Sequence, residues 1–298
     1  MTDTPAADIA IRTVELTKRY AGVLAIDHVT LSIPKGSLFG LIGPNGAGKT
    51  TTLAILASVV APTSGQTEIL GFDPVEFPAE LRRVVGYMPD ALGVYEGLRV
   101  DEYLEFFAAA YRIARSQWAG LIDGLLELVD LQDKRSAMVD SLSRGMKQRL
   151  SLARALVHDP AVLLLDEPAS GLDPRARFDL RALLIELRTM GKTVVISSHI
   201  LSELEEMCTD VAIMGAGKVL ASGPPDELRE AMRPGRSVSV RLQGGETMTY
   251  TVGDDEAQTD LLRRLIVDEK LPILEFIQAQ DTLEDLFLHI TEPAQEAT

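Results

Sequence analysis

The sequence predicts an α/β fold with a helical insertion and a small appended α+β domain. Strand-like runs recur with helical patterns between several of them, at residues 9–16, 37–43, 161–167 and 193–199. Between residues 92 and 157 the pattern changes to almost continuous helix. Two short alternating runs near the C-terminus flank the turn sequence QGGE, as in a β-hairpin. These three observations indicate a parallel sheet with crossover helices, interrupted once by helices and followed by a second domain.

We expect the domain boundary at residue 225, which gives domains of residues 1–225 and 226–298 with the helical insertion at about 92–157. The second domain carries 13 acidic and 5 basic residues from Gly235 onward. After its hairpin we expect, in order, a helix, a strand, a final helix and a polar tail, at residues 261–269, 273–278, 283–290 and 291–298.

Local signals set the helix boundaries. Pro160 is expected to end the helix that runs through Val157, because a residue before proline is pushed out of the α region. Gly191 follows RALLIELRTM at the position where a left-handed glycine ends a helix. Asp173, directly before Pro174, is placed to cap the next helix.

Composition limits the classes of function. A chain of 298 residues that is 46% hydrophobic can bury a substantial core. Its net charge of −15 opposes binding of nucleic acid or anionic lipid through a general positive field, so no nucleic-acid partner is expected. A single cysteine, Cys208, rules out an internal disulfide, and the acidic start lacks signal-peptide features. These two features favour the cytoplasm. No apolar run approaches the ~18 to 20 residues of a spanning helix, so we do not expect the protein to cross a membrane by itself.

Residues 43–50, GPNGAGKT, match the phosphate-binding pattern G-x-x-x-x-G-K-[ST] between a predicted strand and a predicted helix. The glycines let backbone N–H groups face phosphate oxygens, Lys49 reaches the β and γ phosphates, and the Thr50 hydroxyl can ligate Mg²⁺. The guanine-binding pattern Asn-Lys-x-Asp is missing, because Asn45 is the only asparagine in the chain. A GTPase is therefore not expected.

Carboxylates follow a second buried strand. Asp166 and Glu167 lie at the carboxyl end of AVLLL, where open α/β sheets bind ligands. Alone they could merely cap a turn; beside a phosphate loop, Asp166 is placed to hold Mg²⁺ and Glu167 to polarise the attacking water. His199, at the end of another strand, is either structural or a contact to the γ phosphate.

The ordered motifs GPNGAGKT, GYMPD, LSRGMKQ, VLLLDEP, SGLD and His199 together resemble the ATP-binding subunit of ABC transporters over roughly residues 9–225. The resemblance implies a P-loop NTPase (RecA-like) core with an antiparallel β subdomain, and an ATPase that uses ATP and Mg²⁺. It implies catalytic roles for Lys49, Glu167 and His199, and metal contacts from Thr50, Asp90 and Asp166. It implies nucleotide contacts from Tyr20, Gly43, Pro44, Asn45, Gly46, Ala47, Gly48, Lys49, Thr50, Thr51, Asp90, Ser143, Gly145 and Asp173.

In this family two cassettes pack head to tail, and the signature segment of one closes over the ATP of the other. By similarity, Ser143 and the Gly145 backbone bind the γ phosphate of a partner's ATP, and Asp173 acts across the dimer. A homodimer is expected, because both halves of the site are present in this chain. Tyr20 matches the aromatic residue that stacks on adenine, although an aromatic residue near a strand end can also belong to the core.

Three departures from the family pattern leave alternatives open. Arg144 replaces a glycine of the signature, and it either adds charge near the phosphates or points to solvent. Asp90 replaces a glutamine; it either approaches Mg²⁺ and couples it to the helical insertion or is only a turn residue after Pro89. SGLD replaces the common SALD, with Asp173 as a helix cap in either case.

The family resemblance also implies a separate integral membrane permease, docked near Asp90 and residues 91–100, which would hold this chain peripherally on the inner face of the membrane. The ending LEDLFLHIT, after Asp281 and Thr282, resembles ABC-2 exporters of drugs, lipids and polysaccharides, and it also fits an ordinary capped helix. The alternative is a soluble ABC ATPase in translation or DNA repair. The single cassette and the absence of a sustained heptad run argue against it.

Overall fold

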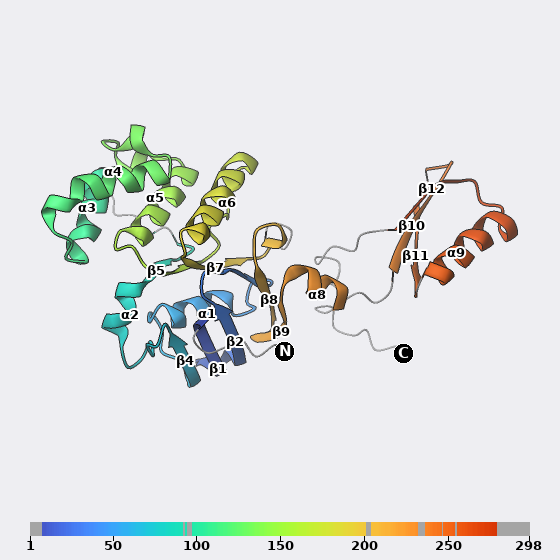
Figure 1. Cartoon of the computed structure of the whole chain (residues 1–298), viewed down its shortest axis with the longest axis horizontal. Helices are drawn as coiled ribbons and strands as arrows, with labels where there is room; N and C mark the ends of the chain where they lie inside the picture. The colour runs from blue at the N-terminus through green and yellow to red at the C-terminus, as the bar shows by residue number, and fades with distance from the viewer. Residues whose placement is uncertain are drawn as a thin grey trace. The chain divides into compact units, whose positions relative to one another are not determined.

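The computed structural model describes residues 8–91, 93, 97–200, 204–231, 236–245, 247–253 and 255–278. The chain divides into two compact units, residues 1–223 and 224–298. This division lies two residues before the boundary that the sequence suggests at 225. Figure 1 shows the elements of each unit.

The larger unit is built on a six-stranded sheet of order β5-β6-β7-β3-β8-β9. Its strands are β3 (Leu38–Ile42), β5 (Val85–Met88), β6 (Val162–Leu165), β7 (Thr193–Ser198), β8 (Asp210–Gly215) and β9 (Lys218–Gly223). The first five strands in the sheet order are parallel, and only β9 runs antiparallel to its neighbour. The carboxyl ends of β6, β7 and β3 therefore lie side by side at one edge.

Two layers cover this sheet. Helix α1 (Lys49–Leu56) and a second, antiparallel sheet of order β2-β1-β4 lie on one face, and helices α5 (Arg144–Leu156) and α6 (Pro174–Thr189) lie on the other (Figure 1). The antiparallel strands are β1 (Ile9–Tyr20), β2 (Val23–Pro34) and β4 (Ser64–Ile69). Helix α2 (Pro78–Val84) leads directly into β5. This architecture confirms the expected α/β core with an antiparallel β subdomain.

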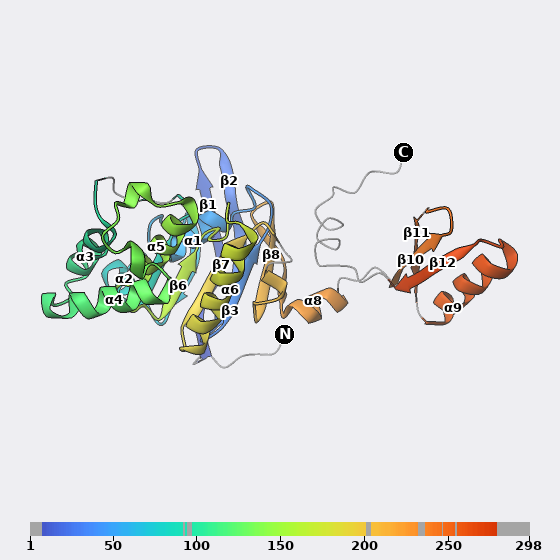
Figure 2. The same cartoon turned by 90° about the horizontal axis from the view of Figure 1, so that it is seen from above.

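Helices α3 (Val100–Ala110), α4 (Trp118–Leu128) and α5 form the helical insertion, and they gather beside β5 and β6 (Figure 2). They pack against one another in all three pairings. Short 3₁₀ turns at Arg115–Gln117, Gln132–Lys134 and Val139–Ser141 connect them. The predicted run of helix between residues 92 and 157 is thus a three-helix subdomain, whose last helix returns the chain to the sheet.

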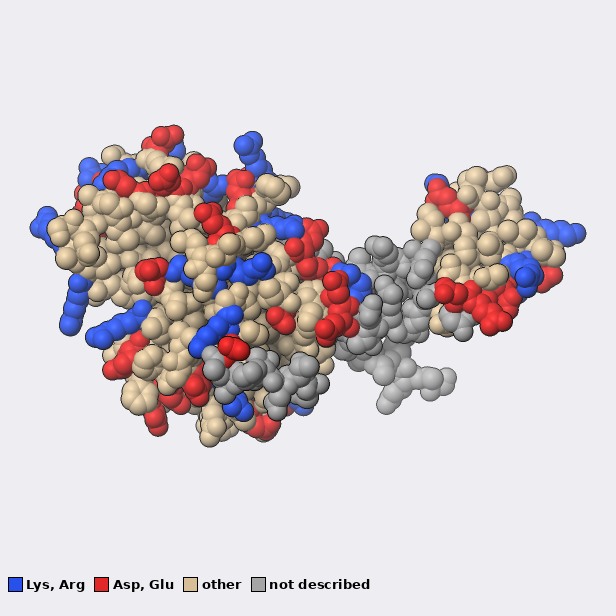
Figure 3. All heavy atoms as spheres, viewed as in Figure 1, with Lys and Arg blue, Asp and Glu red and all other residues tan. Residues whose placement is uncertain are grey.

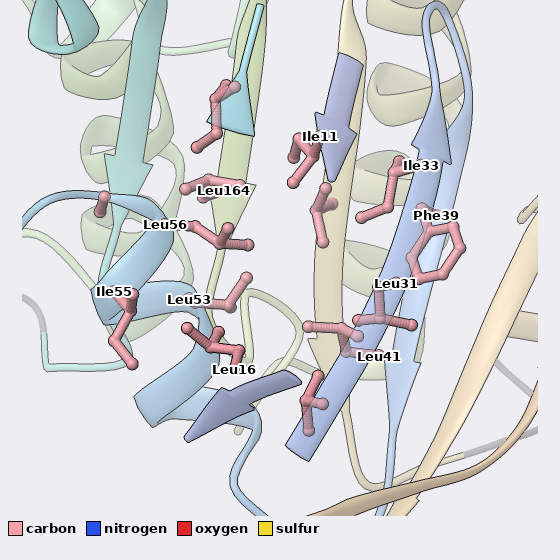
Figure 4. Packing of buried hydrophobic residues seen from close by; sticks show 14 of the residues in the cluster. Ile11, Leu16, Leu31, Ile33, Phe39, Leu41, Leu53, Ile55, Leu56 and Leu164 are labelled. Carbon is pink, nitrogen blue, oxygen red and sulfur yellow. The ribbon is translucent and has the colours of Figure 1, made fainter. Parts of the chain in front are cut away.

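The main core lies between α1, the antiparallel sheet and one face of the large sheet. Ile11 of β1, Leu41 of β3, Leu53 of α1 and Leu164 of β6 are all fully buried and belong to one cluster (Figure 4). Apolar residues from strands and a helix interlock here because alternate strand positions point to the same face. The phosphate loop connects β3 to α1, and both of these elements are anchored in this core.

The expected helix ends are present. Asp173 caps α6, with Pro174 as its first residue, and Gly191 follows the helix with φ of +87°. Helix α5 ends at Leu156, one residue before the expected end. The prediction for His199 needs one small correction, because β7 stops at Ser198 and the histidine is the first residue after the strand.

The smaller unit contains a three-stranded antiparallel sheet of order β11-β10-β12. Its elements are α8 (Pro225–Ala231), β10 (Arg236–Leu242), β11 (Thr247–Val252), α9 (Asp255–Arg263), a π-helical turn at Arg264–Asp268 and β12 (Ile273–Gln278). Val238 and Val240 pack against Leu261 and Leu265 in its core. The expected hairpin and strand are confirmed, and the expected helix is present but begins at Asp255, six residues before the predicted start at 261. The helix expected at 283–290 and the polar tail lie outside the described residues.

No helix in the described ranges has both the length and the apolar character needed to span a bilayer.

The close contact between β5 and α5 can be tested by replacing a glycine at the contact with alanine. A Cβ added to Gly86 of β5 would lie 2.3 Å from the Ala155 carbonyl oxygen of α5, whereas a Cβ at Gly124 in α4 would meet nothing within 4 Å. We expect Gly86→Ala to lower the free energy of unfolding by about 1–3 kcal/mol through overpacking. Gly124→Ala should raise it by about 0.5–1 kcal/mol, because alanine favours helix. Urea unfolding of the two variants measures both changes, and equal effects would contradict the described contact.

Candidate nucleotide site

The phosphate loop is a cradle whose shape depends on two glycines. A Cβ at Gly43 would lie 2.4 Å from the Met214 carbonyl oxygen, and a Cβ at Gly48 would lie 2.7 Å from the Ala25 carbonyl oxygen. Gly48 also has φ of +101°, in the left-handed region, and directly precedes α1. Only glycine fits these positions, so the sequence pattern follows from packing against β8 and β2.

The loop leaves backbone donors available. Ala47 donates to the Pro44 carbonyl oxygen at 3.1 Å and thereby closes the turn. Within the described residues, no hydrogen bond is found from the N–H groups of Asn45, Gly46 or Gly48. The first turn of α1, which contains Thr50 and Thr51, holds no acidic residue. A loop of free N–H groups at a helix start is the arrangement that binds phosphate oxygens.

Lys49 is buried beneath this loop, with 5% of its side chain exposed. Its Nζ donates to the Gly43 carbonyl oxygen at 2.7 Å and to the Pro44 carbonyl oxygen at 3.3 Å. The same Nζ lies 3.3 Å from Oε1 of Glu167. The ammonium is therefore fixed between the loop and a carboxylate, at the place where phosphate charge would be neutralised.

Asp166 is completely buried at the end of β6. Its Oδ1 accepts hydrogen bonds from the Ser197 hydroxyl at 2.7 Å and from the Thr50 hydroxyl at 3.2 Å. Burial raises the pKa of this carboxyl above its ordinary value of 3.8, and the nearby charges of Asp90 and Glu167 raise it further, against the lowering effect of the two hydroxyls. Asp166 and Thr50, which come from separate motifs, thus meet as predicted.

The Asp166 carboxylate fits a magnesium site. Its Oδ2 is buried and has no hydrogen-bond partner among the described residues. An unpartnered buried carboxylate oxygen beside a threonine hydroxyl suits a hard cation, which prefers oxygen ligands and keeps several waters. Thr50 and Asp166 are the residues that would hold Mg²⁺, directly or through its water shell.

Glu167 has a strained backbone and a shared side chain. Its φ of +48° is unusual for a residue with a side chain, and such strain is commonly found at functional sites. Its N–H donates to the Ser197 hydroxyl at 2.9 Å, which fixes the turn after β6. Its Oε2 lies 2.9 Å from Nδ1 of His199, while Oε1 faces Lys49. The carboxylate is thus held between two nitrogen groups at the carboxyl edge of the sheet.

The remaining residues that were predicted to contact nucleotide or metal, His199, Tyr20 and Asp90, are more exposed than Lys49 and Asp166. His199 is about half exposed beside Glu167, at 48% of its side chain. Tyr20 is exposed at the end of β1, before the turn into β2, and Lys18 Nζ lies 5.0 Å from its ring centroid. The tyrosine is not a core residue, so that alternative is wrong. Asp90 is exposed and lies close enough to Asp166 to influence its pKa.

The signature segment forms a second surface. Ser143 caps α5, and its Oγ accepts a hydrogen bond from Met146 N–H at 3.3 Å. Asp173 caps α6 by accepting from Ala176 N–H at 2.9 Å. Ser143, Gly145 and Asp173 line one hollow of about 540 Å³ whose lining includes no residue of the phosphate loop. The chain therefore presents the signature and the phosphate loop as separate surfaces.

Sequence reasoning missed two residues that organise the site. Ser197 is fully buried and joins Asp166 to the Glu167 backbone. Gln148 of α5 reaches the Glu167 carbonyl oxygen at 3.4 Å. A signal existed for Ser197, because it directly follows the apolar run Val194–Ile196 in a buried strand. Nothing in the local pattern distinguishes Gln148 from a surface residue of an amphipathic helix.

Comparison with known proteins gives consistent matches. The sequence matches the ABC transporter family over residues 26–170. It is 35% identical to the bacitracin transport ATP-binding protein BcrA of Bacillus licheniformis, over 94% of this chain and 96% of that protein. It is 34% identical to the Nod factor export ATP-binding protein I of Neorhizobium galegae, over 96% and 86% of the two chains. A solved dimeric ATP-binding cassette in a post-hydrolysis state, bound to ADP and Pi, matches with a TM-score of 0.67 and 25% identity, over 72% of this chain and 98% of that one.

Replacing the buried Asp166 should raise the stability of the protein and abolish its activity. In EDTA at pH 7, Asp166→Asn should unfold at a higher urea concentration than the parent, because it removes a buried charge and can keep both hydroxyl hydrogen bonds. The Asp166 carboxyl of the parent protein has a raised pKa in the folded state. At a pH above that pKa, its ionisation therefore lowers the free energy of unfolding. The difference should therefore be full at neutral pH and vanish as the pH falls through the raised pKa towards 3.8. The variant should lose Mg²⁺-dependent ATP hydrolysis, and lower stability of the Asp166→Asn protein at pH 7 would contradict the described burial.

Proposed function

The chain belongs to the ABC transporter family as an ATP-binding protein that hydrolyses ATP with Mg²⁺, and we propose that it works as a head-to-tail dimer that drives a separate membrane permease. The observation that carries the proposal is the division of the site into two surfaces. The phosphate loop, Asp166, Glu167 and His199 meet at one sheet edge. The hollow at Ser143 and Gly145 contains none of them. Each surface supplies what the other lacks.

Hydrolysis follows from the contacts of Glu167. Phosphate oxygens compete with this carboxylate for Lys49, because both are anions within reach of one ammonium. When Lys49 binds phosphate, Glu167 keeps His199 as its neighbour and is able to accept a proton from the attacking water. His199 orients the carboxylate and can reach the γ phosphate from the exposed side. Thr50 and Asp166 would hold Mg²⁺, which would neutralise charge on the phosphates when bound.

The dimer follows from the second surface. Backbone donors at the start of α5 and the Ser143 hydroxyl are suited to the γ phosphate of an ATP bound by another copy. Asp173 lies in the same hollow and acts across the interface. A second copy of this chain suffices as partner, because the chain carries both surfaces. The solved dimeric cassette supports this arrangement.

The output is transport, and we place the permease contact between the α/β core and the helical insertion, near Asp90. Asp90 is exposed, lies two residues after the end of β5 and is close enough to Asp166 to influence the pKa of its carboxyl. Residues 92 and 94–96 of the expected docking stretch lie outside the described part of the chain. Phe106 on α3 gives the helical insertion an exposed aromatic side chain.

Export is the proposed direction. Both full-length relatives act in transport or export, and their alignments cover more than nine tenths of this chain. The ABC-2-like ending after Asp281 and Thr282 lies outside the described residues. The proposed location is the inner face of the cell membrane, held there by the permease.

A soluble cassette ATPase for translation or DNA repair is not favoured. The relatives named above are transport proteins rather than ATPases that act on nucleic acid. On the face of the larger unit shown in Figure 3, Lys and Arg are interspersed with Asp and Glu and form no broad basic area. A net charge of −15 points the same way.

Tyr20 gives a prediction about nucleotide binding. If its exposed ring stacks on adenine, Tyr20→Ala should weaken ATP binding by roughly 5- to 150-fold, the value of one base–aromatic stack. Phe77→Ala is the matched control, because Phe77 is 45% exposed and Tyr20 is 44% exposed. Titration of a fluorescent ATP analogue into each variant measures the affinity. Equal affinity in both variants would reject the stacking role.

The dimer and its partner are tested with Glu167→Gln. This variant should bind ATP, hydrolyse it about 100- to 10,000-fold more slowly through loss of the base, and accumulate as an ATP-dependent dimer. Lys49→Ala, the comparison variant, should fail to bind ATP and stay monomeric. Size-exclusion chromatography with light scattering measures the mass of each.

The same Glu167→Gln protein, tagged in its native host and purified from gently solubilised membranes with ATP, identifies the partner. A stoichiometric polytopic membrane protein is the expected result. Recovery of ribosomes, nucleic acid or only soluble proteins would make the transporter proposal wrong.

A further inference from the structure

Two departures from the family pattern, in different motifs, touch one another. Arg144 is the first residue of α5, and Gly171 lies in the SGLD segment before α6. A Cβ built on Gly171 would lie 2.5 Å from Cζ of Arg144, 2.7 Å from Nε and 2.9 Å from Nη1. The guanidinium therefore occupies the volume that any side chain at position 171 would need. The guanidinium of Arg144 can lie at this position only because residue 171 is a glycine and has no side chain.

The guanidinium at this position is exposed and unpaired. Arg144 is exposed, and its side chain has no hydrogen bond or ion pair with any described residue. Its neighbour Arg149 is different, because it is bound to Asp130 at 2.9 Å and to Asp179 at 2.8 Å. The Arg144 guanidinium lies over Gly171 without a salt bridge, so all of its donors remain available.

The hollow around Arg144 is lined by three arginines and three aspartates. Arg144 lines the same hollow of about 540 Å³ as Ser143, Gly145, Asp173 and Arg175. The three carboxylates of that hollow have partners, since Asp130 and Asp179 bind Arg149, and Asp173 accepts from Ala176 N–H. Among the charges of the described lining, Asp173, Arg144 and Arg175 have no ion-pair partner, and Arg144 and Arg175 are the two cations of this group. A guanidinium binds phosphate through two parallel N–H bonds, which suits it to a triphosphate.

We propose that Arg144 contacts the phosphates of the ATP bound by a second copy of the chain, and that Gly171 holds the guanidinium in position for this contact. The inference rests on the proposed head-to-tail dimer and adds a residue to its composite site. The pair also joins the signature segment to the segment before α6 within one chain, so that the two close on the nucleotide as one surface.

The test is a double-mutant cycle in the Glu167→Gln background, with full-length protein. The measurement is the ATP concentration that gives half-maximal dimer by light scattering. Arg144→Ala should raise this concentration about tenfold or more, because a charge-assisted contact is lost. Gly171→Ala should raise it by a similar factor, because the new methyl group displaces the guanidinium. The double variant should equal Arg144→Ala alone, since Gly171 then has nothing to position.

Controls separate this effect from backbone strain and from folding. Gly171 has φ of +70°, so alanine there is strained in any case. Gly191→Ala is the matched control, because Gly191 has φ of +87° and a Cβ there meets nothing within 4 Å. It should leave dimerisation unchanged. The ATP affinity of the monomeric protein should be the same with and without Arg144, since the contact is made only to a partner's nucleotide. Arg144→Lys should recover part of the loss.

The outcomes also separate this inference from the proposed function. If the Glu167→Gln protein binds ATP without dimerising, the head-to-tail dimer itself is wrong. If it dimerises, and Arg144→Ala leaves the half-maximal ATP concentration unchanged, the dimer stands and the role of Arg144 is overturned. If only Gly171→Ala leaves it unchanged, the positioning role of Gly171 is overturned. Additive effects of the two substitutions would show that Gly171 does not act through Arg144.

Discussion

The buried carboxylate of Asp166 is the point on which the site depends. Oδ1 of Asp166 accepts hydrogen bonds from the Ser197 hydroxyl of β7 and the Thr50 hydroxyl of α1. The backbone N–H of Asp166 donates to the Met88 carbonyl oxygen at the end of β5. Four elements are therefore tied together at one residue. Burial raises its pKa, so the protein keeps a group there that opposes folding at neutral pH. Such a conflict between local stability and chemistry is typical of a functional site.

The order of the sheet makes this junction possible. Strands β6, β7 and β3 are neighbours and parallel, so the residues that follow them emerge at one edge. The phosphate loop follows β3, Asp166 and Glu167 follow β6, and His199 follows β7. Residues more than a hundred positions apart thus come within hydrogen-bond distance. The apolar core beneath fixes the strands and α1, and it thereby fixes the spacing between lysine, carboxylates and histidine.

The sequence predicts the parts of this site that depend on a short, continuous stretch of residues. The glycine pattern of residues 43–50, the apolar strand before Asp166 and the cap at Asp173 each occupy a short stretch, and each is found as expected. The antiparallel sheet came from resemblance, because β4, with the sequence SGQTEI, is largely polar and carries no strand signal by itself. Contacts such as Gln148 with Glu167 and Arg144 with Gly171 join distant positions, and periodicity and composition contain no information about them.

The segment from Glu167 to Asp173 connects the two surfaces of the proposed dimer. Glu167 begins it beside Lys49, and Asp173 ends it as the cap of α6 in the hollow. Two hydrogen bonds tighten it, from Ser170 N–H to the Glu167 carbonyl oxygen at 3.0 Å and from Leu172 N–H to the Ala169 carbonyl oxygen at 3.2 Å. The segment thus ties the residue beside Lys49 to the cap of α6 through seven consecutive residues. In the proposed dimer, the same short segment would border the chain's own nucleotide at one end and its partner's nucleotide at the other.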